Sequence, residues 1–126
     1  MTNKEQELFF DNMVSQMKTI MSKKSKDYAG DDIDTDKLSN FKLAGNICGI
    51  GGSMNCLSLI ATKVARLGVL LNTKQVPNNE SIMDSILDLA NYTVLLAMIL
   101  DDKIVKETET NETADLRIRQ YLWKAE

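Results

Sequence analysis

The chain has 126 residues, the size of a single domain built around one hydrophobic core. Apolar residues make up 44% and charged residues 26%, as in ordinary globular proteins, which argues against wholesale disorder. The formal net charge of −3 disfavours binding to a nucleic-acid duplex, because such binding needs a clearly basic surface. The chain contains no histidine, which excludes Ser-His-Asp and Cys-His catalysis within one chain.

The two cysteines, Cys48 and Cys56, stand in a glycine-rich region and do not form the close pairs of a zinc site. We expect free thiols in a reducing compartment, with a disulfide as the alternative. The N-terminal residues are polar and acidic, unlike a signal peptide. The most apolar stretch, residues 93–100, is much shorter than the ~20 residues of a membrane span. The sequence therefore predicts a cytoplasmic location (the host cytoplasm if the protein is phage-encoded) and no membrane partner.

The first half of the chain predicts one long and one short helix. Residues 4–24 form the first helix, since apolar residues recur at spacings of three and four, namely Leu8, Phe9, Met13, Met17, Ile20 and Met21. Residues 25–37 are a polar, aspartate-rich connection. Residues 38–48 predict a short helix with apolar contacts from Leu38, Phe41, Leu43 and Ala44.

Two further long helices follow. The second runs from a Ser53 cap to about Leu71, with a buried side formed by Leu57, Ile60, Val64, Leu67 and Leu71. The third begins at Glu80 after an Asn79 cap and extends to about Lys103. Long helices joined by a short polar loop usually pack as an antiparallel pair.

The predicted fold is all-α, a small helical bundle of three main helices plus a short inserted helix and a C-terminal extension. Residues 1–106 form the helical domain, and residues 107–126 form a linker and a C-terminal helical extension of the same domain. Small helical chains often build ligand pockets between subunits, so we expect a homo-oligomer. Trp123 and the methionine-rich first helix are the expected interface.

Acidic side chains follow one face of the third predicted helix. Glu80, Asp84, Asp88 and Asn91 are separated by four, four and three residues, which places them on the same side. Three acids so spaced repel one another unless positive charge lies beside them. Magnesium is one candidate, because it prefers carboxylate oxygens, and lysine or arginine partners are another. An exposed, solvated stripe is the third interpretation.

Lys63 and Arg66 lie three residues apart on one face of the second predicted helix. In an antiparallel pair they would meet Asp84 and Asp88 directly. They would equally well grip phosphate, with arginine giving planar two-point contacts and lysine a point charge. Both interpretations stay open at the level of sequence.

Two smaller clusters are candidates for ligand contacts. Lys26, Asp27 and Tyr28 form a compact polar cluster after the first predicted helix, for which a simple turn is the alternative. Asn40 stands beside Phe41 in the short helix. An amide beside an aromatic ring suits reading the edge of a base while stacking on it, although an aromatic residue such as Phe41 is more often part of the core.

Four strings occur in order along the chain, namely KSKDYAG, SNFKLAG, KVARLGVLL and ESIMDSILDLANY. Together they resemble the phage and bacterial family called nucleotide modification associated domain 1. The resemblance covers most of residues 23–96, and the last string is its most specific part. It implies a protein that handles a nucleotide.

The helical layout more distantly resembles the all-α nucleoside triphosphate pyrophosphatases, the MazG-like and dimeric dUTPase group. Those enzymes hold magnesium around a triphosphate with paired acidic motifs on two antiparallel helices. The resemblance makes Glu80, Asp84 and Asp88 the counterpart of their second acidic motif. The second helix carries Lys63 and Arg66 where those enzymes have two acids three residues apart.

Two principal functions follow. In the first, the protein is a Mg²⁺-dependent nucleotide pyrophosphohydrolase, with Glu80, Asp84 and Asp88 as metal ligands and Asp84 and Asp88 as catalytic residues. The substrate would contact Lys63, Arg66, Asn40, Phe41, Lys26, Tyr28 and Asn91. In the second, the protein binds a nucleotide or cyclic-nucleotide signal without catalysis, as an anti-defence sponge would. A purely structural role for the charges is the third hypothesis.

Overall fold

The structure is a computed structural model of the chain, and it describes residues 1–29, 36–74, 76–77, 80–108 and 123. These residues form four helices and no strand, namely α1 (Asn3–Ala29), α2 (Ser39–Ile47), α3 (Gly51–Thr73) and α4 (Ile82–Thr108). The all-α prediction, with three long helices and one short inserted helix, is confirmed. Asn79 and most of the predicted C-terminal extension lie outside the described residues. Within the extension, residues 107–108 belong to α4, and Trp123 is helical and exposed.

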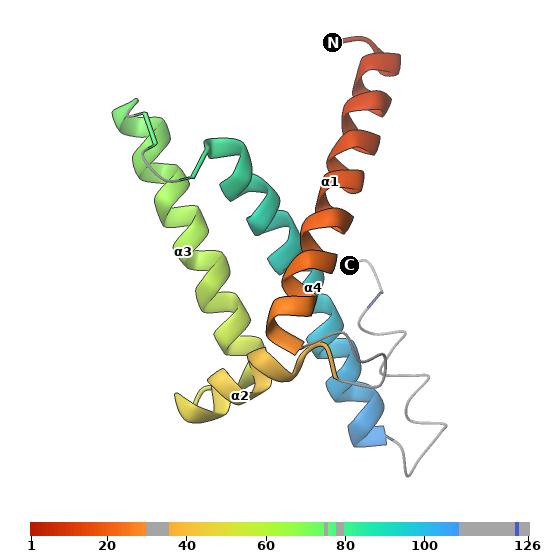
Figure 1. Cartoon of the computed structure of the whole chain (residues 1–126). Helices are drawn as coiled ribbons and strands as arrows, with labels where there is room; N and C mark the ends of the chain where they lie inside the picture. Colours follow the sequence, from red (N-terminus) through yellow and green to blue (C-terminus); the bar gives the residue numbers. More distant parts are fainter. Residues whose placement is uncertain (30–35, 75, 78–79, 109–122, 124–126) are drawn as a thin grey trace.

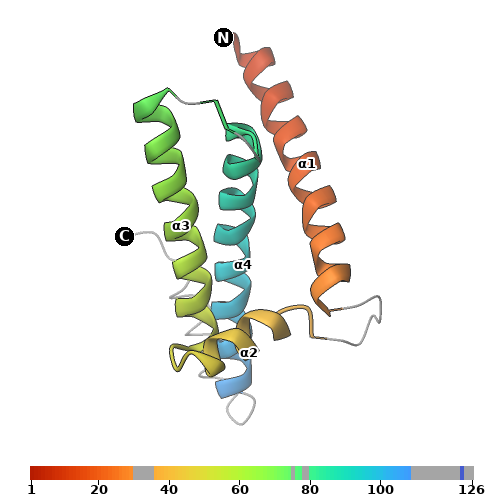
Figure 2. The same cartoon turned by 60° about the vertical axis from the view of Figure 1, so that its left-hand side comes forward.

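The long helices stand roughly side by side, with α4 between α3 and α1 (Figures 1 and 2). α3 and α4 run antiparallel, as predicted, and α2 packs across the end of this pair at which α3 begins. α1 packs mainly on α4, and its N-terminal half projects away from the other helices. Lys42 of α2 pairs with Asp102 of α4 at 2.6 Å and with Asp36 at 2.6 Å. The four helices therefore meet at one end of the molecule.

Side-chain caps fix the starts of two long helices. The Thr2 hydroxyl accepts a hydrogen bond from the Glu5 backbone N–H at 3.2 Å, and the Glu5 carboxylate accepts one from the Thr2 N–H at 2.6 Å. Ser81 and Asp84 make the same reciprocal pair at the start of α4, at 3.0 and 3.2 Å. Each pair is a capping box, which satisfies backbone N–H groups that the helix leaves without partners.

Glycines shape the corner between α2 and α3. Gly49 and Gly51 have φ values of +72° and +79°, which glycine adopts without steric cost. Gly45 packs against the backbone of Gly51 so closely that a Cβ atom at residue 45 would collide with the Gly51 carbonyl. The predicted Ser53 cap is wrong, because α3 begins at Gly51 and Ile50 precedes it without a side-chain cap.

The buried side of α3 differs from the prediction. Leu57, Val64 and Leu71 were expected to be buried, but they are 44%, 53% and 62% exposed. The side that faces α4 instead follows spacings of three and four through residues that are buried or half-buried, namely Cys56, Leu59, Lys63, Arg66 and Leu70. α3 is therefore rotated so that its two cations, rather than its most apolar stripe, face α4.

Apolar composition makes two helices resemble membrane spans. α3 and residues 82–103 of α4 are each long and apolar enough, by length and composition alone, to cross a bilayer. Core helices of globular proteins pass the same test, although only 11% and 22% of these two windows are buried inside the structure. The prediction that the protein has no membrane partner stays a prediction.

Candidate functional site

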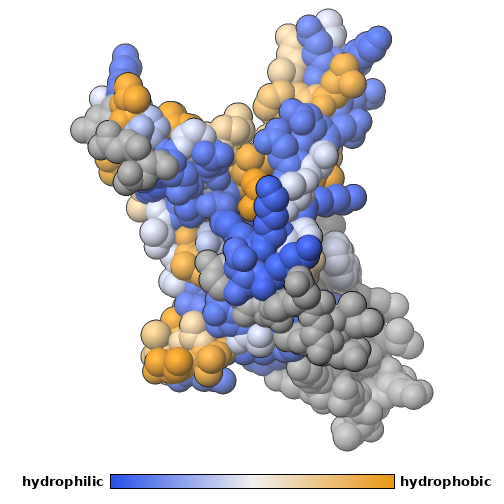
Figure 3. Space-filling view, viewed as in Figure 1, coloured by the Kyte–Doolittle hydropathy of each residue, from blue (hydrophilic) through white to orange (hydrophobic). Residues whose placement is uncertain are grey.

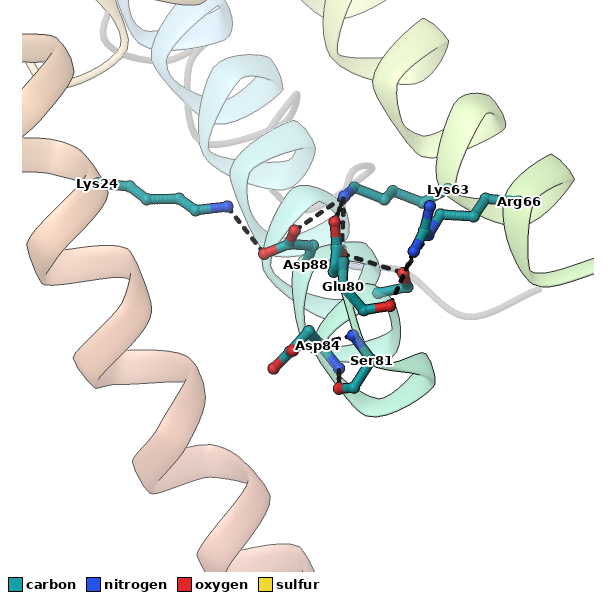
Figure 4. A network of polar contacts seen from close by, with 8 residues as sticks. Lys24, Lys63, Arg66, Glu80, Ser81, Asp84 and Asp88 are labelled. Atoms are coloured by element: carbon teal, nitrogen blue, oxygen red, sulfur yellow. Dashed lines mark hydrogen bonds and ion pairs between the residues drawn. The ribbon is translucent and has the colours of Figure 1, made fainter. Parts of the chain in front are cut away.

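Asp88 is the centre of an ion-pair network that joins three helices (Figure 4). Lys24 of α1 reaches its Oδ1 atom at 2.8 Å, and Lys63 of α3 reaches its Oδ2 atom at 2.9 Å. Lys63 also contacts both Glu80 carboxylate oxygens, at 3.0 and 3.2 Å. The Asp88 and Lys63 side chains are only 14% and 17% exposed, so water screens their attraction poorly.

Arg66 extends the network along α3 toward the start of α4. Its Nε atom donates to the Ser85 hydroxyl at 3.1 Å, and its Nη2 atom donates to the Glu80 backbone carbonyl at 2.8 Å. The Ser85 hydroxyl is fully buried and donates in turn to Glu80 Oε1 at 3.0 Å. Of the contacts that the first sequence interpretation predicted, Lys63–Asp88 forms, whereas Arg66 contacts neither aspartate and bonds instead to Ser85 of α4 and to Glu80, which lies just before α4.

Asp84 does not join this network. Figure 4 shows it beside Ser81, one turn below the lysines, where its carboxylate accepts the Ser81 backbone N–H as part of the capping box. Asp84 was expected to meet Lys63 and Arg66, and this expectation is wrong because the carboxylate is used to begin α4. Its side chain is exposed.

The network sets the protonation of its members. Burial would raise the pKa of the Asp88 carboxyl, but hydrogen bonds from Lys24 and Lys63 outweigh burial and hold this pKa below its ordinary value. Burial would lower the pKa values of Lys24 and Lys63, yet their bonds to Asp88 raise both. All three groups are therefore charged at neutral pH.

The acidic residues do not form a metal cage. Within the described part of the chain, no group of three or more His, Cys, Asp or Glu side chains lies close enough to hold an ion. Lys63 stands between Glu80 and Asp88 and contacts both carboxylates. Magnesium binding by these residues stays a prediction, and it requires the Lys63 ammonium to leave its present position.

A pocket of about 290 Å³ opens beside the network where the four helices meet. Two aromatic side chains, Phe41 and Tyr92, line it, and Met21, Ala44, Leu59 and Leu95 contribute apolar surface. Its polar lining consists of three amides, two lysines, a serine and a carboxylate, namely Asn40, Asn55, Asn91, Lys24, Lys37, Ser25 and Asp88. An apolar pocket with a few polar groups is the ordinary form of a small-molecule site.

Asn91 is the most informative residue of this lining. It is 5% exposed, and its Nδ2 atom donates to the Met17 backbone carbonyl of α1 at 3.1 Å. A carbonyl only accepts, so this bond fixes which end of the amide faces α1. The Asn91 Oδ1 atom is buried and has no hydrogen-bond partner among the described residues. A buried acceptor without a donor costs free energy, which a donor on a ligand or a water molecule recovers.

The remaining pocket residues differ in how firmly they are held. Asn55 donates weakly to the Phe41 carbonyl at 3.4 Å, which ties α3 to α2. The Lys24 ammonium lies 5.9 Å from the centre of the Tyr92 ring, within the range of a cation–π contact. The Lys24 side chain is 44% exposed and keeps access to solvent.

The structure brings together only part of the predicted site. Asn40, Phe41, Asp88 and Asn91 line the pocket, whereas Lys63 and Arg66 lie in the network next to it. The predicted cluster after the first helix is not a turn, because α1 continues to Ala29 and includes it. Lys26 is exposed there, and the Tyr28 side chain lies outside what the structure describes.

Sequence reasoning missed Lys24, Asn55 and Tyr92 as pocket residues. Lys24 stands in a lysine-rich segment at the end of the first predicted helix, where positive charge also complements the helix dipole. The available signal for Tyr92 was its position directly after Asn91, which was itself a predicted ligand contact. Asn55 had no signal, because its role depends on where α2 crosses α3.

Comparison of the chain with protein-family models, curated proteins and solved structures found no match. The resemblance to the nucleotide modification associated domain 1 family therefore stays a prediction.

Proposed function

We propose that the chain binds a nucleotide, or a small molecule derived from one, in the pocket where its four helices meet. One observation carries this proposal. Asn91 lines the pocket, and its buried Oδ1 atom accepts no hydrogen bond from any described residue. An exocyclic amine or ring N–H of a base supplies such a donor. The Met17 bond keeps the acceptor from rotating away.

The other lining residues have the chemistry that the rest of a nucleotide needs. Phe41 and Tyr92 offer ring faces on which a base stacks, a contact that contributes about 1–3 kcal/mol per base. Lys24 is partly exposed at the pocket, where its ammonium suits a phosphate. The volume of about 290 Å³ lies at the lower end of ligand pockets, so we assign the base to the interior and the phosphates to the opening.

Binding without hydrolysis agrees better with the carboxylates than catalysis does. Both oxygens of Asp88 accept from lysines, and Glu80 accepts from Lys63 and Ser85. The alternative, a Mg²⁺-dependent pyrophosphohydrolase, draws its support from Asp88, which lines the pocket and would face bound phosphate. That chemistry requires magnesium to displace Lys63.

The test is incubation of the pure protein with nucleoside triphosphates, monophosphates and cyclic nucleotides, with magnesium in one series and EDTA in the other. Protein and solution are then separated and analysed by mass spectrometry. We expect an unaltered nucleotide to stay with the protein in EDTA and to be released on denaturation. Monophosphate and pyrophosphate formed only with magnesium would establish the hydrolase instead. If no nucleotide stays with the protein and none is hydrolysed, the nucleotide proposal is wrong.

A matched pair of variants assigns the binding to this pocket. Phe41→Leu removes a stacking face and keeps an apolar side chain, so we expect at least about fivefold weaker binding. Leu43→Ala is the control, because Leu43 lies on the same helix, is 63% exposed and is not part of the pocket. Equal affinity of both variants for the nucleotide would place its site elsewhere.

A further inference from the structure

α3 carries a second apolar stripe, on the side away from its cations. Positions 54, 57, 61, 64, 68 and 71 alternate spacings of three and four over 18 residues, which is the a/d pattern of a coiled coil. Apolar or small residues occupy all six positions, namely Met54, Leu57, Ala61, Val64, Gly68 and Leu71. We call these six residues the α3 stripe. Every one of them is exposed.

The ion-pair network explains why the α3 stripe is exposed. At 3.6 residues per turn, Lys63 and Arg66 lie on the opposite side of the helix from Ala61, Val64 and Gly68. Because both cations bond to groups of the α4 segment, α3 has one rotational setting, and this setting turns the stripe outward. The exposure is thus a consequence of specific contacts.

The rest of the molecule leaves little apolar burial to stabilise a monomer. Among the described residues, only four apolar side chains are buried, namely Cys56, Leu70, Leu87 and Ile99. A domain of this length ordinarily buries about two thirds of the surface of its chain. The α3 stripe therefore represents apolar surface that a folded chain normally covers.

We infer that a second copy of this chain covers the α3 stripe, giving a two-fold dimer through packed α3 helices. In a two-fold interface the same patch serves both subunits, so it must tolerate its own charge. Every exposed residue of α3 is uncharged, and no like charges would face each other across the axis. Ala61 and Gly68 also leave room for close approach, since nothing lies within 4 Å of a Cβ placed on Gly68.

The extent of the surface suits such a dimer. The α3 stripe runs about 26 Å along the helix at 1.5 Å per residue. It continues into the corner between α2 and α3, where Ile47 and Ile50 are 77% and 46% exposed. Figure 3 shows this corner as an apolar patch at the lower left. Such continuity helps the interface approach the roughly 800 Å² per partner of a standard protein interface.

A lipid bilayer is the rival occupant, and the pattern of α3 argues against it. A helix embedded in lipid is apolar around its whole circumference, whereas the exposed surface of α3 mixes polar side chains with the α3 stripe, Ala65 and Val69. The exposed polar residues of α3 include Ser58, Thr62 and Asn72, which are not part of the stripe. Lys63 and Arg66 lie mid-helix, where a bilayer makes charge costly.

The test is the molar mass of the full chain in solution, by sedimentation and light scattering over a range of concentrations. We expect twice the 14.1 kDa chain mass for the wild type and the single-chain mass for Val64→Lys at the same concentration. Thr62→Lys is the control, because it adds the same charge to an exposed position of α3 away from the stripe and should leave the dimer intact.

A second measurement covers the case in which the separated Val64→Lys chain does not fold. Thermal unfolding of a wild-type dimer shifts to higher temperature as protein concentration rises, whereas that of a monomer does not. A wild-type monomer at all concentrations would overturn the inference, as would a Val64→Lys variant of unchanged mass. A chain that is monomeric in buffer but floats with phosphatidylcholine and phosphatidylglycerol vesicles would overturn it in favour of a membrane surface.

Discussion

Removal of the Asp88 carboxylate tests whether the ion-pair network holds the helices together. The bond to Lys63 joins two largely buried side chains and contributes about 1.5–3 kcal/mol. The bond to Lys24 contributes about 0–1 kcal/mol, because Lys24 is 44% exposed and returns to water when its partner is lost. Lys63 keeps Glu80 as a partner in the variant. We therefore expect Asp88→Ala to lower the free energy of unfolding by about 2–3 kcal/mol.

The assay is urea unfolding followed by circular dichroism, with all variants at one protein concentration. Asp84→Ala is the matched control, since it removes the same side chain from the same helix but affects only an exposed cap. We expect this control to cost about 1 kcal/mol. If Asp88→Ala lowers the free energy of unfolding by no more than Asp84→Ala does, the network is not the main polar contact between α1, α3 and α4.

Three further predictions concern the glycine corner, pH and the thiols. Gly45→Ala should destabilise by about 3 kcal/mol in the same urea assay, because the new methyl meets the Gly51 carbonyl, and wild-type stability would show that the corner yields. The lowered pKa of Asp88 means that its stabilisation is complete above the unfolded pKa near 3.9 and is lost as pH falls through the folded pKa. Because the pKa values of its lysine partners are raised, the stabilisation is also lost at alkaline pH, above about pH 10.4. Unfolding free energies measured between about pH 5 and 8 should therefore be nearly constant, and a marked slope there would contradict the assignment. Cys48 is exposed and should react quickly with a thiol reagent, whereas Cys56 is fully buried with a pKa raised by burial and should react only after unfolding.

The helices themselves could be predicted because their signals are local. Apolar spacings of three and four, one proline and the glycine-rich break at residues 49–52 identified all four helices. The start of α4 also had a local signal, the pair Ser81 and Asp84, although Asp84 was assigned to the acidic face. Ser81 and Asp84 follow the S-x-x-D form of a capping box, but Asp84 was grouped with the other acids because it shares their helical face.

The rotation of α3 could not be predicted from apolar pattern alone, because the helix has two stripes with the same periodicity. One contains Leu57, Val64 and Leu71, and the other contains Lys63 and Arg66. The first was assigned to the core on hydrophobicity. The charges of the second decided the outcome, since leaving partly buried Glu80 and Asp88 without cations would cost more than exposing leucines.

The pocket was beyond sequence reasoning for a different reason. Its residues come from all four helices, and no spacing along the chain places Lys24 beside Tyr92 or Asn55 beside Phe41. Asn55 meets Phe41 because α2 crosses the start of α3, and Lys24 meets Tyr92 because α1 packs on α4. The predicted residues that do line the pocket had local signals, since Asn91 shares a helical face with Asp88 and Asn40 stands beside Phe41.

The attachment of α1 has a consequence for cooperativity. Two polar contacts join α1 to α4, the Lys24–Asp88 ion pair and the Asn91–Met17 hydrogen bond. Lys24, Asp88 and Asn91 all line the pocket, so an occupant of the pocket acts on the groups that hold α1. A ligand that draws Lys24 away from Asp88 would lower the equilibrium constant for docking of α1 on α4. By linkage, docking of α1 would lower the affinity for that ligand by the same factor. If a ligand binds in the pocket, the free energy that holds α1 on α4 should therefore change with occupancy.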